Sequence, residues 1–308
     1  MNKNKPAPKK NEVNKDYRNL KQFPIKKQCE LLAFLLESFP SQSRNSIKSL
    51  LSSHRVSIDG APVSQFNFKL FPGDTVIISS SPIRKKTRSN LPIIYEDSEF
   101  IVINKPSGLL SVASDKEKGS TAYRMLSDYV QQKDKHNRIF VIHRLDEDTS
   151  GVLMVAKSPT IQKKLQDHWN ELVVKRGYYA IVEGKMENPK GTVKSYLKKN
   201  TQNMMYSSQK PKDGQLAITN YEVIQESDSY SLLDVNIETG RKNQIRVHMG
   251  DLGHFVIGDD KYGNPSNPLK RLGLHAYCLE LKHPDTGKVL KFTSPMPKDF
   301  SLLFSQKK

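Results

Sequence analysis

A short polar segment, His143 to Gly151, carries the residues whose types and spacing are best suited to chemistry. It reads HRLDEDTSG and sets Asp146 among other charged side chains. Short apolar runs rich in β-branched residues flank it, which predicts a loop between two buried strands. Such a loop can hold a carboxylate rigidly and leave it open to a partner. The alternative is a turn whose side chains hydrogen-bond their own backbone.

A second dense segment, Thr239 to Gly250, reads TGRKNQIRVHMG. Ile245, Met249 and Leu252 have helical spacing, and Gly253 is suited to end that helix. Arg246 then projects from the helix off its apolar face, and a buried arginine needs an anionic partner. The residues themselves leave open which partner it takes. The candidates are a phosphate of a binding partner and the carboxylates of Asp146, Asp148, Asp251, Asp259 and Asp260.

Charge is the most informative property of the composition. The 308 residues carry a formal net charge of +17, which favours a polyanionic partner, most often nucleic acid. Apolar runs stay shorter than the roughly 20 residues of a membrane span, and the polar N-terminus does not resemble a signal peptide. Cys29 and Cys278 lie far apart, as free thiols in a reducing compartment would. We therefore expect a cytoplasmic protein that does not associate with membranes.

Composition divides the chain into four parts. Residues 1–22 form a lysine-rich tail that we expect to be disordered. Residues 23–80 form a small unit, and residues 81–91 form a basic linker whose like charges keep it extended. The large domain takes residues 92–308.

The small unit has two helical patterns followed by a hairpin. Ser41 or Ser43 caps the second helix, and Arg44 and Lys48 fall one turn apart on its polar face. Arg55 leads into a hairpin that turns at Asp59-Gly60. The segments SRNSIKSLLSSHRVSIDGAPV and FPGDTVII resemble the alpha-L RNA-binding domain of a ribosomal small-subunit protein. That resemblance implies RNA contacts from these three cations, whereas the alternative is a helical hairpin with a solvated basic face.

The large domain mixes helices and strands without a repeating βα unit. This pattern predicts an α+β fold with a mixed, largely antiparallel central sheet and flanking helices. Strands are predicted at Ile93–Tyr95, Phe100–Ile103 and Tyr178–Val182. One helical stripe runs from Ile161 to Leu172 and includes the single tryptophan, Trp169, as a core residue.

Several segments of the large domain together resemble the RluA family of pseudouridine synthases. They are NKPSGLL, HRLDEDTSGVLMVAKS, KRGYYAIVEG, TGRKNQIRVHMGDLGHFVIGDDKYG and RLGLHAYCLELKHPDTGKVLKF, and they span roughly Pro92 to Phe304. The resemblance implies the pseudouridine synthase fold and an enzyme that isomerises uridines in RNA. Many family members carry an alpha-L domain in front.

The resemblance also implies roles for three residues. Asp146 is the carboxylate that acts at the ribose, either as nucleophile or as base. Arg246 is its counter-charge, because an opposite charge nearby favours the ionised carboxylate. Tyr178 packs against the target base and assists proton removal at carbon 5, while strand alternation turns Tyr179 to the opposite face. The isomerisation needs no redox change and no group donor, so we expect no cofactor.

Other cations are expected to meet the RNA. The target base must leave its stack before a side chain can reach the sugar bond. Arg144 resembles the family arginine that fills the vacated space, and a surface phosphate contact is the alternative. Arg241 and Lys242 are expected at the RNA backbone. Lys242 and Asn243 replace the Thr-His pair that is usual in the family, which we interpret as a variation that affects RNA contact.

Two functions from different classes remain open on the residues alone. The first is an RNA pseudouridine synthase that acts on ribosomal RNA, with the large subunit favoured and transfer RNA as an alternative. The second is a non-catalytic RNA-binding or ribosome-assembly protein, which would not need Asp146, Tyr178 and Arg246 together. The late histidines have no zinc-like spacing, so we expect no metal. A monomer is the default expectation.

Overall fold

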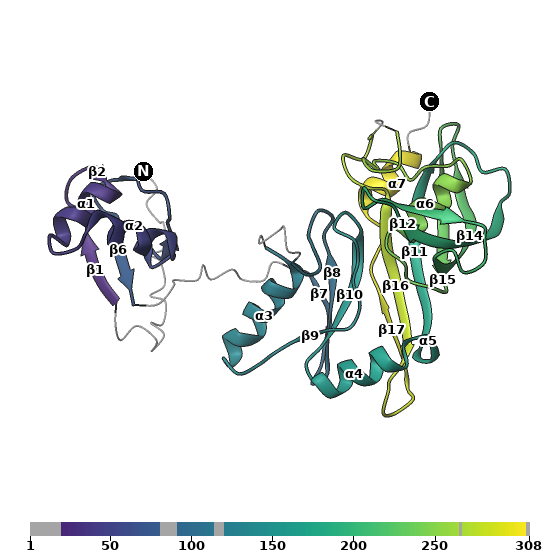
Figure 1. The fold of residues 1–308 in the computed structure, drawn as a ribbon, viewed down its shortest axis with the longest axis horizontal. Coiled ribbons are helices and arrows are strands. Elements are labelled where there is room, and N and C mark those ends of the chain that lie inside the picture. The colour runs from purple at the N-terminus through teal and green to yellow at the C-terminus, as the bar shows by residue number, and fades with distance from the viewer. Residues whose placement is uncertain (1–19, 81–90, 114–119, 265–266, 306–308) are drawn as a thin grey trace, which may run out of the picture. The chain divides into compact units, whose positions relative to one another are not determined.

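The computed structural model describes residues 20–80, 91–113, 120–264 and 267–305 (Figure 1). The chain forms two compact units, Met1–Thr87 and Arg88–Lys308. Residues 1–19 of the predicted tail and 81–90 of the predicted linker lie outside the described residues.

The first unit packs two short helices against antiparallel strands. Ser43 caps the second helix by accepting a hydrogen bond from the Ser46 amide. Asp59 and Gly60, both with positive φ, form the predicted hairpin turn. The main sheet has the order β1-β6-β3-β4, and β2 pairs with β5. The elements are β1 (Leu20–Pro24), β2 (Cys29–Glu30), α1 (Leu31–Ser38), α2 (Arg44–Ser52), β3 (Val56–Ile58), β4 (Ala61–Pro62), β5 (Lys69–Leu70) and β6 (Thr75–Ser79).

The edges of the predicted parts differ slightly from the observed units. Residues 20–22, predicted as tail, belong to β1, which pairs with β6. Leu91, predicted as the end of the linker, is 5% exposed and packs in the core of the second unit. Both errors have the same cause, because a polar or basic neighbourhood hides a single strand or core residue at its edge.

The second unit contains an 11-stranded mixed sheet of order β13-β12-β14-β15-β11-β16-β10-β8-β7, with β17 paired to β16 and β9 to β10. The predicted α+β fold with a largely antiparallel sheet is confirmed. The strands are β7 (Ile93–Glu96), β8 (Phe100–Lys105), β9 (Phe140–Val141), β10 (Ser150–Ala156), β11 (Val173–Glu183), β12 (Lys190–Lys199), β13 (Met205–Ser208), β14 (Gln215–Glu226), β15 (Tyr230–Ile237), β16 (Leu274–Lys282) and β17 (Val289–Thr293).

The junction between β10 and β16 is parallel, unlike the other pairings between described strands. Ser150 pairs with His275 and Gly151 with Ala276. Gly151 has a φ of +116°, and a Cβ at this position would lie 2.1 Å from the Ala276 carbonyl oxygen. Only glycine therefore lets the two strands approach this closely.

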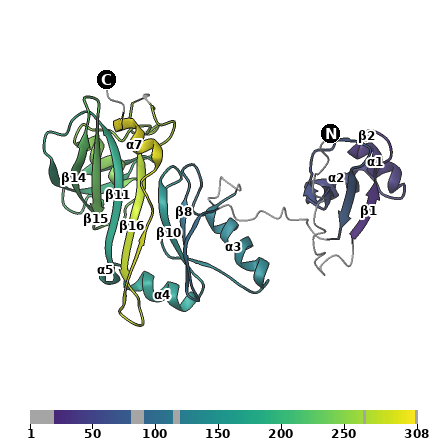
Figure 2. The same cartoon turned by 180° about the vertical axis from the view of Figure 1, so that it is seen from behind.

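Helices flank this sheet, and α7 lies at the opposite end of β16 from α4 and α5 (Figures 1 and 2). The predicted helix through Trp169 is interrupted at His168, and Trp169 is only partly buried against the core. The helices are α3 (Ala122–Lys133), α4 (Pro159–Asp167), α5 (Trp169–Leu172), α6 (Gln244–Asp251) and α7 (Lys298–Ser305).

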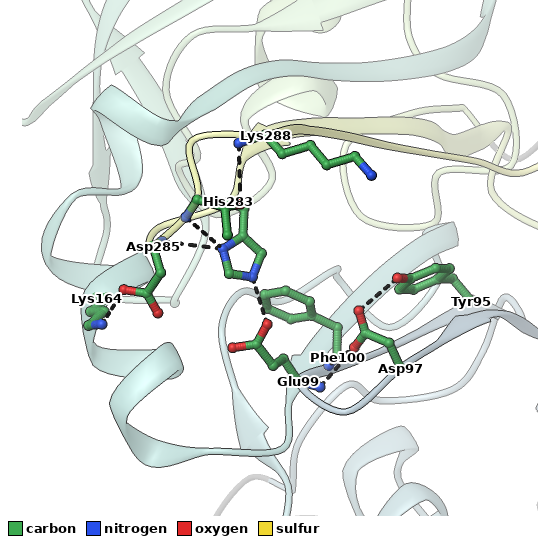
Figure 3. A network of polar contacts seen from close by, with 9 residues as sticks. Tyr95, Asp97, Glu99, Phe100, Lys164, His283, Asp285 and Lys288 are labelled. Carbon is green, nitrogen blue, oxygen red and sulfur yellow. Dashed lines mark hydrogen bonds and ion pairs between the residues drawn. The ribbon is translucent and has the colours of Figure 1, made fainter.

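A polar network ties the hairpin between β16 and β17 to neighbouring elements (Figure 3). His283 Nε2 lies 2.7 Å from a Glu99 carboxylate oxygen, and its Nδ1 accepts hydrogen bonds from the amides of Asp285 and Thr286. The proton of the neutral ring must then reside on Nε2. Asp285 also pairs with Lys164 of α4. The network therefore fixes the hairpin to the start of β8 and to α4.

Two kinds of feature are absent from the described residues. No helix in this part of the chain is long and apolar enough to cross a membrane. No group of three or more His, Cys, Asp or Glu side chains in the same residues is arranged to hold a metal ion.

Candidate active site

The segment between β9 and β10, residues 142–149, is a loop as predicted, and we call it the Asp146 loop. His143 anchors its start, because its Nε2 accepts the Met154 amide at 3.1 Å and its ring packs 5.5 Å from the Trp169 ring. Burial lowers the pKa of His143 to about 4, and Arg176 adds to this effect. The neutral imidazole is thus a fixed acceptor that orients the loop.

The NKPSGLLS segment, residues 104–111, holds the backbone of the Asp146 loop by hydrogen bonds. Lys105 Nζ donates to the carbonyls of Pro106, Leu109 and Glu147 at 3.0, 2.6 and 2.8 Å. Ser107 donates to the Asp148 carbonyl. The Ser111 hydroxyl both donates to the Leu145 carbonyl and accepts the Leu145 amide. Since the backbone bonds are made on this side, the Asp146 side chain is left to the pocket.

Lys105 is fully buried at the end of β8, a position where a lysine is rarely found unless it is paired. Burial lowers its pKa to about 8, although the charges of Asp148, Asp146 and Glu147 favour the protonated form. The sequence reasoning missed this residue. A signal for it existed, because Lys105 continues the inward register of Ile101 and Ile103 on the strand.

The lowered pKa of Lys105 predicts a rise of stability with pH. In the unfolded chain a lysine titrates near 10.4, so between about pH 8 and 10.4 the unfolded state binds more protons than the folded state. The fall from 10.5 to about 8 corresponds to on the order of 3 kcal/mol. Urea denaturation at pH 7 and pH 10 should therefore show wild type gaining stability relative to Lys105→Met, which cannot titrate. Parallel pH profiles of the two proteins would contradict this assignment.

A cavity of about 400 Å³ opens between the Asp146 loop, β11 and the start of α6. Asp146, Tyr178 and Arg246, which lie far apart in sequence, all line it. Asp146 is the one carboxylate among the described lining residues. The other lining residues are Ile142, His143, Arg144, Leu145, Thr149, Gln166, Trp169, Arg176, Ile237, Gly240, Arg241, Lys242, Asn243, Gln244, Ile245 and Leu274.

Tyr178 forms the β11 wall of this cavity. Burial raises the pKa of its hydroxyl to about 12, with a further rise from Asp146 that Arg176 opposes. The phenol is therefore neutral at physiological pH. Tyr179 points to the other face, where its ring stacks 4.2 Å from that of Tyr277, as strand alternation predicts.

Arg246 makes its ion pair with Asp259, which corrects the expected direct pairing with Asp146. Its Nε and Nη2 donate to the two Asp259 carboxylate oxygens at 2.7 and 2.5 Å, and the two side chains are 7% and 1% exposed. Burial opposes the charge on Arg246, but Asp259, with smaller contributions from Asp146 and Asp148, raises its pKa. Asp146 thus contributes to the raised pKa of Arg246 by electrostatic attraction, whereas Asp259 holds the guanidinium in an ion pair.

Asn243 is buried, and its side chain is bonded within the protein although it also lines the cavity. It adopts a left-handed backbone conformation, with φ of 54°, just before α6. Its side-chain amide donates to the Tyr262 hydroxyl at 3.0 Å, and that hydroxyl also accepts the Met205 amide. The Asn243 side chain therefore links α6 to the edge of the sheet rather than facing solvent.

The cations expected at RNA fall into two groups in this unit. Arg144 and Lys242 are exposed at the mouth of the cavity. Arg241 is half-buried, and its Nε donates to the Leu216 carbonyl at 2.9 Å, so part of its guanidinium is used internally. Arg176 is a lining cation that the sequence reasoning missed, although it lies two residues before Tyr178 and so on the same face of β11.

The basic residues of the first unit lie on and beside α2. Arg44 and Lys48 are exposed one turn apart, as predicted. Arg55 is half-buried, and its Nε has no hydrogen-bond partner among the described residues.

Comparisons with known proteins agree with this architecture. The family model of RNA pseudouridylate synthases matches residues 99–251. The uncharacterized RNA pseudouridine synthase YlyB of Bacillus subtilis is 32% identical over 282 residues, covering 88% of this chain and 91% of the relative. The ribosomal large subunit pseudouridine synthase D of Nitrosomonas europaea is 32% identical over 287 residues, covering 87% and 81%.

Solved structures support the same fold. The human RNA pseudouridylate synthase domain containing 4 superimposes with a TM-score of 0.56 at 23% identity, covering 68% of this chain and 90% of the other. A fold and cavity of this kind, together with these relatives, define an enzyme that isomerises uridine in RNA, a pseudouridine synthase. The chain belongs to the RluA family of these enzymes.

Proposed function

We propose that Asp146 is the catalytic carboxylate and acts at the ribose of the target uridine. The observation that carries this proposal is that Asp146 is the one acid among the described residues that line the cavity. In the reaction the bond between ribose carbon 1′ and uracil N1 breaks, and carbon 1′ joins carbon 5. N1 gains a proton and carbon 5 loses one, so the sum of atoms is unchanged. A carboxylate is suited to this chemistry both as a nucleophile and as a base.

Tyr178 and Arg246 complete the proposed catalytic group. The neutral Tyr178 phenol packs against the uracil ring, and its raised pKa supports a role as a protonated group rather than as an anion. Arg246, held by Asp259, supplies positive charge to the cavity that Asp146 also lines. Both side chains line the same cavity as Asp146.

The rim cations are proposed to hold the RNA. Arg144 lies two residues before Asp146 at the cavity mouth, where it can occupy the space left by the flipped base. Lys242 and the outer part of Arg241 meet phosphates. Arg44, Lys48 and Arg55 of the first unit, which resembles an alpha-L domain, add a second basic surface.

Ribosomal RNA is the proposed substrate, with the large subunit favoured over transfer RNA. Relatives that match most of the chain are named ribosomal large subunit pseudouridine synthase D. The alpha-L resemblance of residues 23–80 and the net charge of +17 also suit a large, structured RNA. The protein is proposed to act as a monomer in the cytoplasm without a metal or small-molecule cofactor.

Tritium release from RNA labelled at uracil carbon 5 tests this function. The purified protein, without added cofactor, should release tritium from a large-subunit ribosomal RNA transcript and not from a transfer RNA mixture. Tritium release from transfer RNA alone would indicate that transfer RNA, rather than ribosomal RNA, is the substrate. No release from either RNA, with the protein bound to both, would favour the non-catalytic RNA-binding alternative.

The basic surface of the first unit gives a separate prediction. In Arg44→Gln/Lys48→Gln, RNA affinity should fall and the slope of log affinity against log salt should lessen by about 1.5, because each phosphate contact contributes about 0.7 to 0.9. The rate of the bound complex should stay unchanged. Lys26→Gln/Lys27→Gln removes the same charge from exposed positions of the same unit and serves as the control. Equal losses of RNA affinity in both variants would mean that overall charge, and not contacts from Arg44 and Lys48, determines binding.

A further inference from the structure

The end of the Asp146 loop is fixed to β16 over a very short distance. Thr149, the last loop residue, donates its amide to the Asp146 carbonyl at 3.2 Å. Ser150 and Gly151 follow at once and make the parallel pairing with His275 and Ala276. The sequence predicts Ser150 and Gly151 in the loop that starts at His143, but both belong to β10. Any displacement of Ser150 is therefore passed to Asp146 through a few rigid bonds.

The buried Ser150 hydroxyl joins Arg271 and His275 through two hydrogen bonds. Arg271 Nη2 lies 2.5 Å from Ser150 Oγ, and His275 Nδ1 lies 2.7 Å from the same oxygen. Because a guanidinium can only donate, Ser150 accepts from Arg271, and its hydroxyl shares a second hydrogen bond with His275 Nδ1. Burial and the charge of Arg271 lower the pKa of His275 to about 4, so its ring is neutral.

Arg271 itself is held from its other side by α7. Its guanidinium carbon lies 5.3 Å from the centroid of the Phe300 ring, and Phe300 is fully buried. Its Nε donates to the Leu272 carbonyl and lies 4.0 Å from an Asp299 carboxylate oxygen. Phe300 in turn packs on Ile181 of β11 and Leu232 of β15. The position of the guanidinium is thus set by the C-terminal helix and the sheet together.

Two cations then bracket the second half of the Asp146 loop. Lys105 holds the Glu147 carbonyl, and Arg271 holds the Ser150 hydroxyl. Arg271 is near enough to Lys105 to lower its pKa, and Asp146 is near enough to raise it. The loop therefore lies over a pair of buried or half-buried positive charges that are anchored independently of the RNA.

We propose that Arg271 is a positioning residue for Asp146, acting through the Ser150 hydroxyl and supported by Phe300 of α7. This inference rests on the proposed catalytic role of Asp146. Arg271 is not one of the described residues that line the cavity, so this role does not require it to touch the RNA. The C-terminal helix thereby contributes to catalysis at a distance from the reacting atoms.

The test combines kinetics on the full chain with hydrogen exchange. Arg271→Met should lower kcat at saturating RNA by about 10- to 100-fold, the loss expected from a small misplacement of a catalytic group, and leave KM near wild type. Ser150→Ala should give a similar loss and keeps the packing of α7. Arg271→Lys should recover part of kcat, because an ammonium can still donate to Ser150. Lys270→Met removes an exposed neighbouring cation and is the control.

The double variant Arg271→Met/Ser150→Ala should be no slower than the worse single variant, because both changes break one link. Amide exchange at Thr149 to Gly151 should accelerate in Arg271→Met and Ser150→Ala, and not in Lys270→Met. The proposal would be overturned if the kcat losses of the two single variants multiplied in the double variant. It would also be overturned if amide exchange at Thr149 to Gly151 stayed unchanged, or if the substitutions altered only KM. Failure of the proposed function can be told apart from failure of this proposal. In the first case the wild-type protein releases no tritium, and amide exchange still tests whether Arg271 positions the loop.

Discussion

Asp146→Asn is expected to lower kcat on the order of 10⁴-fold, because it removes the carboxylate that acts at the ribose and keeps its shape. The asparagine fits the same half-exposed position in the loop, so RNA affinity and the free energy of unfolding should stay close to wild type. The measurement is single-turnover tritium release at saturating RNA. Denaturation and filter binding on the same preparation separate a chemical defect from a folding or binding defect.

Asp148→Asn is the matched control for this prediction. Asp148 lies in the same loop and is exposed, and the Ser107 contact uses only its carbonyl, which the substitution retains. It should therefore keep nearly full activity. Tritium release by Asp146→Asn at the wild-type rate would refute the assignment of Asp146. An equal loss in both variants would indicate that loop charge, rather than one carboxylate, matters.

Local patterns predicted the position of Asp146 well. Two apolar runs with a polar segment between them specify strand, loop and strand, and the structure has β9, the Asp146 loop and β10. Alternation along β11 separated Tyr178 from Tyr179, and the cavity and the Tyr277 stack lie on their opposite faces. Period-two and period-3.6 patterns report which face a residue takes, and that was enough for these residues.

The partner of Arg246 could not be predicted in the same way. Asp259 lies in an irregular segment after α6, where no periodicity indicates direction. The choice among several nearby acids depends on how that segment folds back on the helix, which is tertiary geometry. The family resemblance offered Asp146 because it assigns both residues to one site, but sharing a cavity does not require a direct ion pair.

The sequence pattern also did not predict that α6 is buried on all sides. Its spacing indicates one apolar face, yet the structure buries residues on all sides from Gln244 to Met249. The polar side chains are tolerated because they bond one another and the sheet. Gln244 donates to Thr219 Oγ1 at 3.0 Å, and His248 bridges Thr219 and Ser195 at 2.8 and 2.9 Å. Such partners come from β12 and β14, far away in sequence, and polarity alone suggests exposure instead.

Asp259→Ala is expected to destabilise the protein by about 3 to 5 kcal/mol, because it leaves the Arg246 charge buried without its partner. The amides of Lys261 and Tyr262, which also donate to Asp259, lose their acceptor. Chemical denaturation measures the effect. Asp260→Ala removes the adjacent, exposed carboxylate and should change stability by less than about 0.5 kcal/mol. Similar losses in the two variants would contradict the burial argument.

A double variant separates the structural role of Arg246 from its proposed catalytic role. Arg246→Met/Asp259→Leu replaces the buried ion pair by apolar side chains of similar size, and such replacements are often neutral or stabilising. Stability should therefore exceed that of Asp259→Ala, although the amides of Lys261 and Tyr262 still lack their acceptor. Tritium release should remain low, because Asp146 then lacks its counter-charge in the cavity. If activity returned together with stability, Arg246 would serve only to hold α6 in place, and Asp146 would act without it.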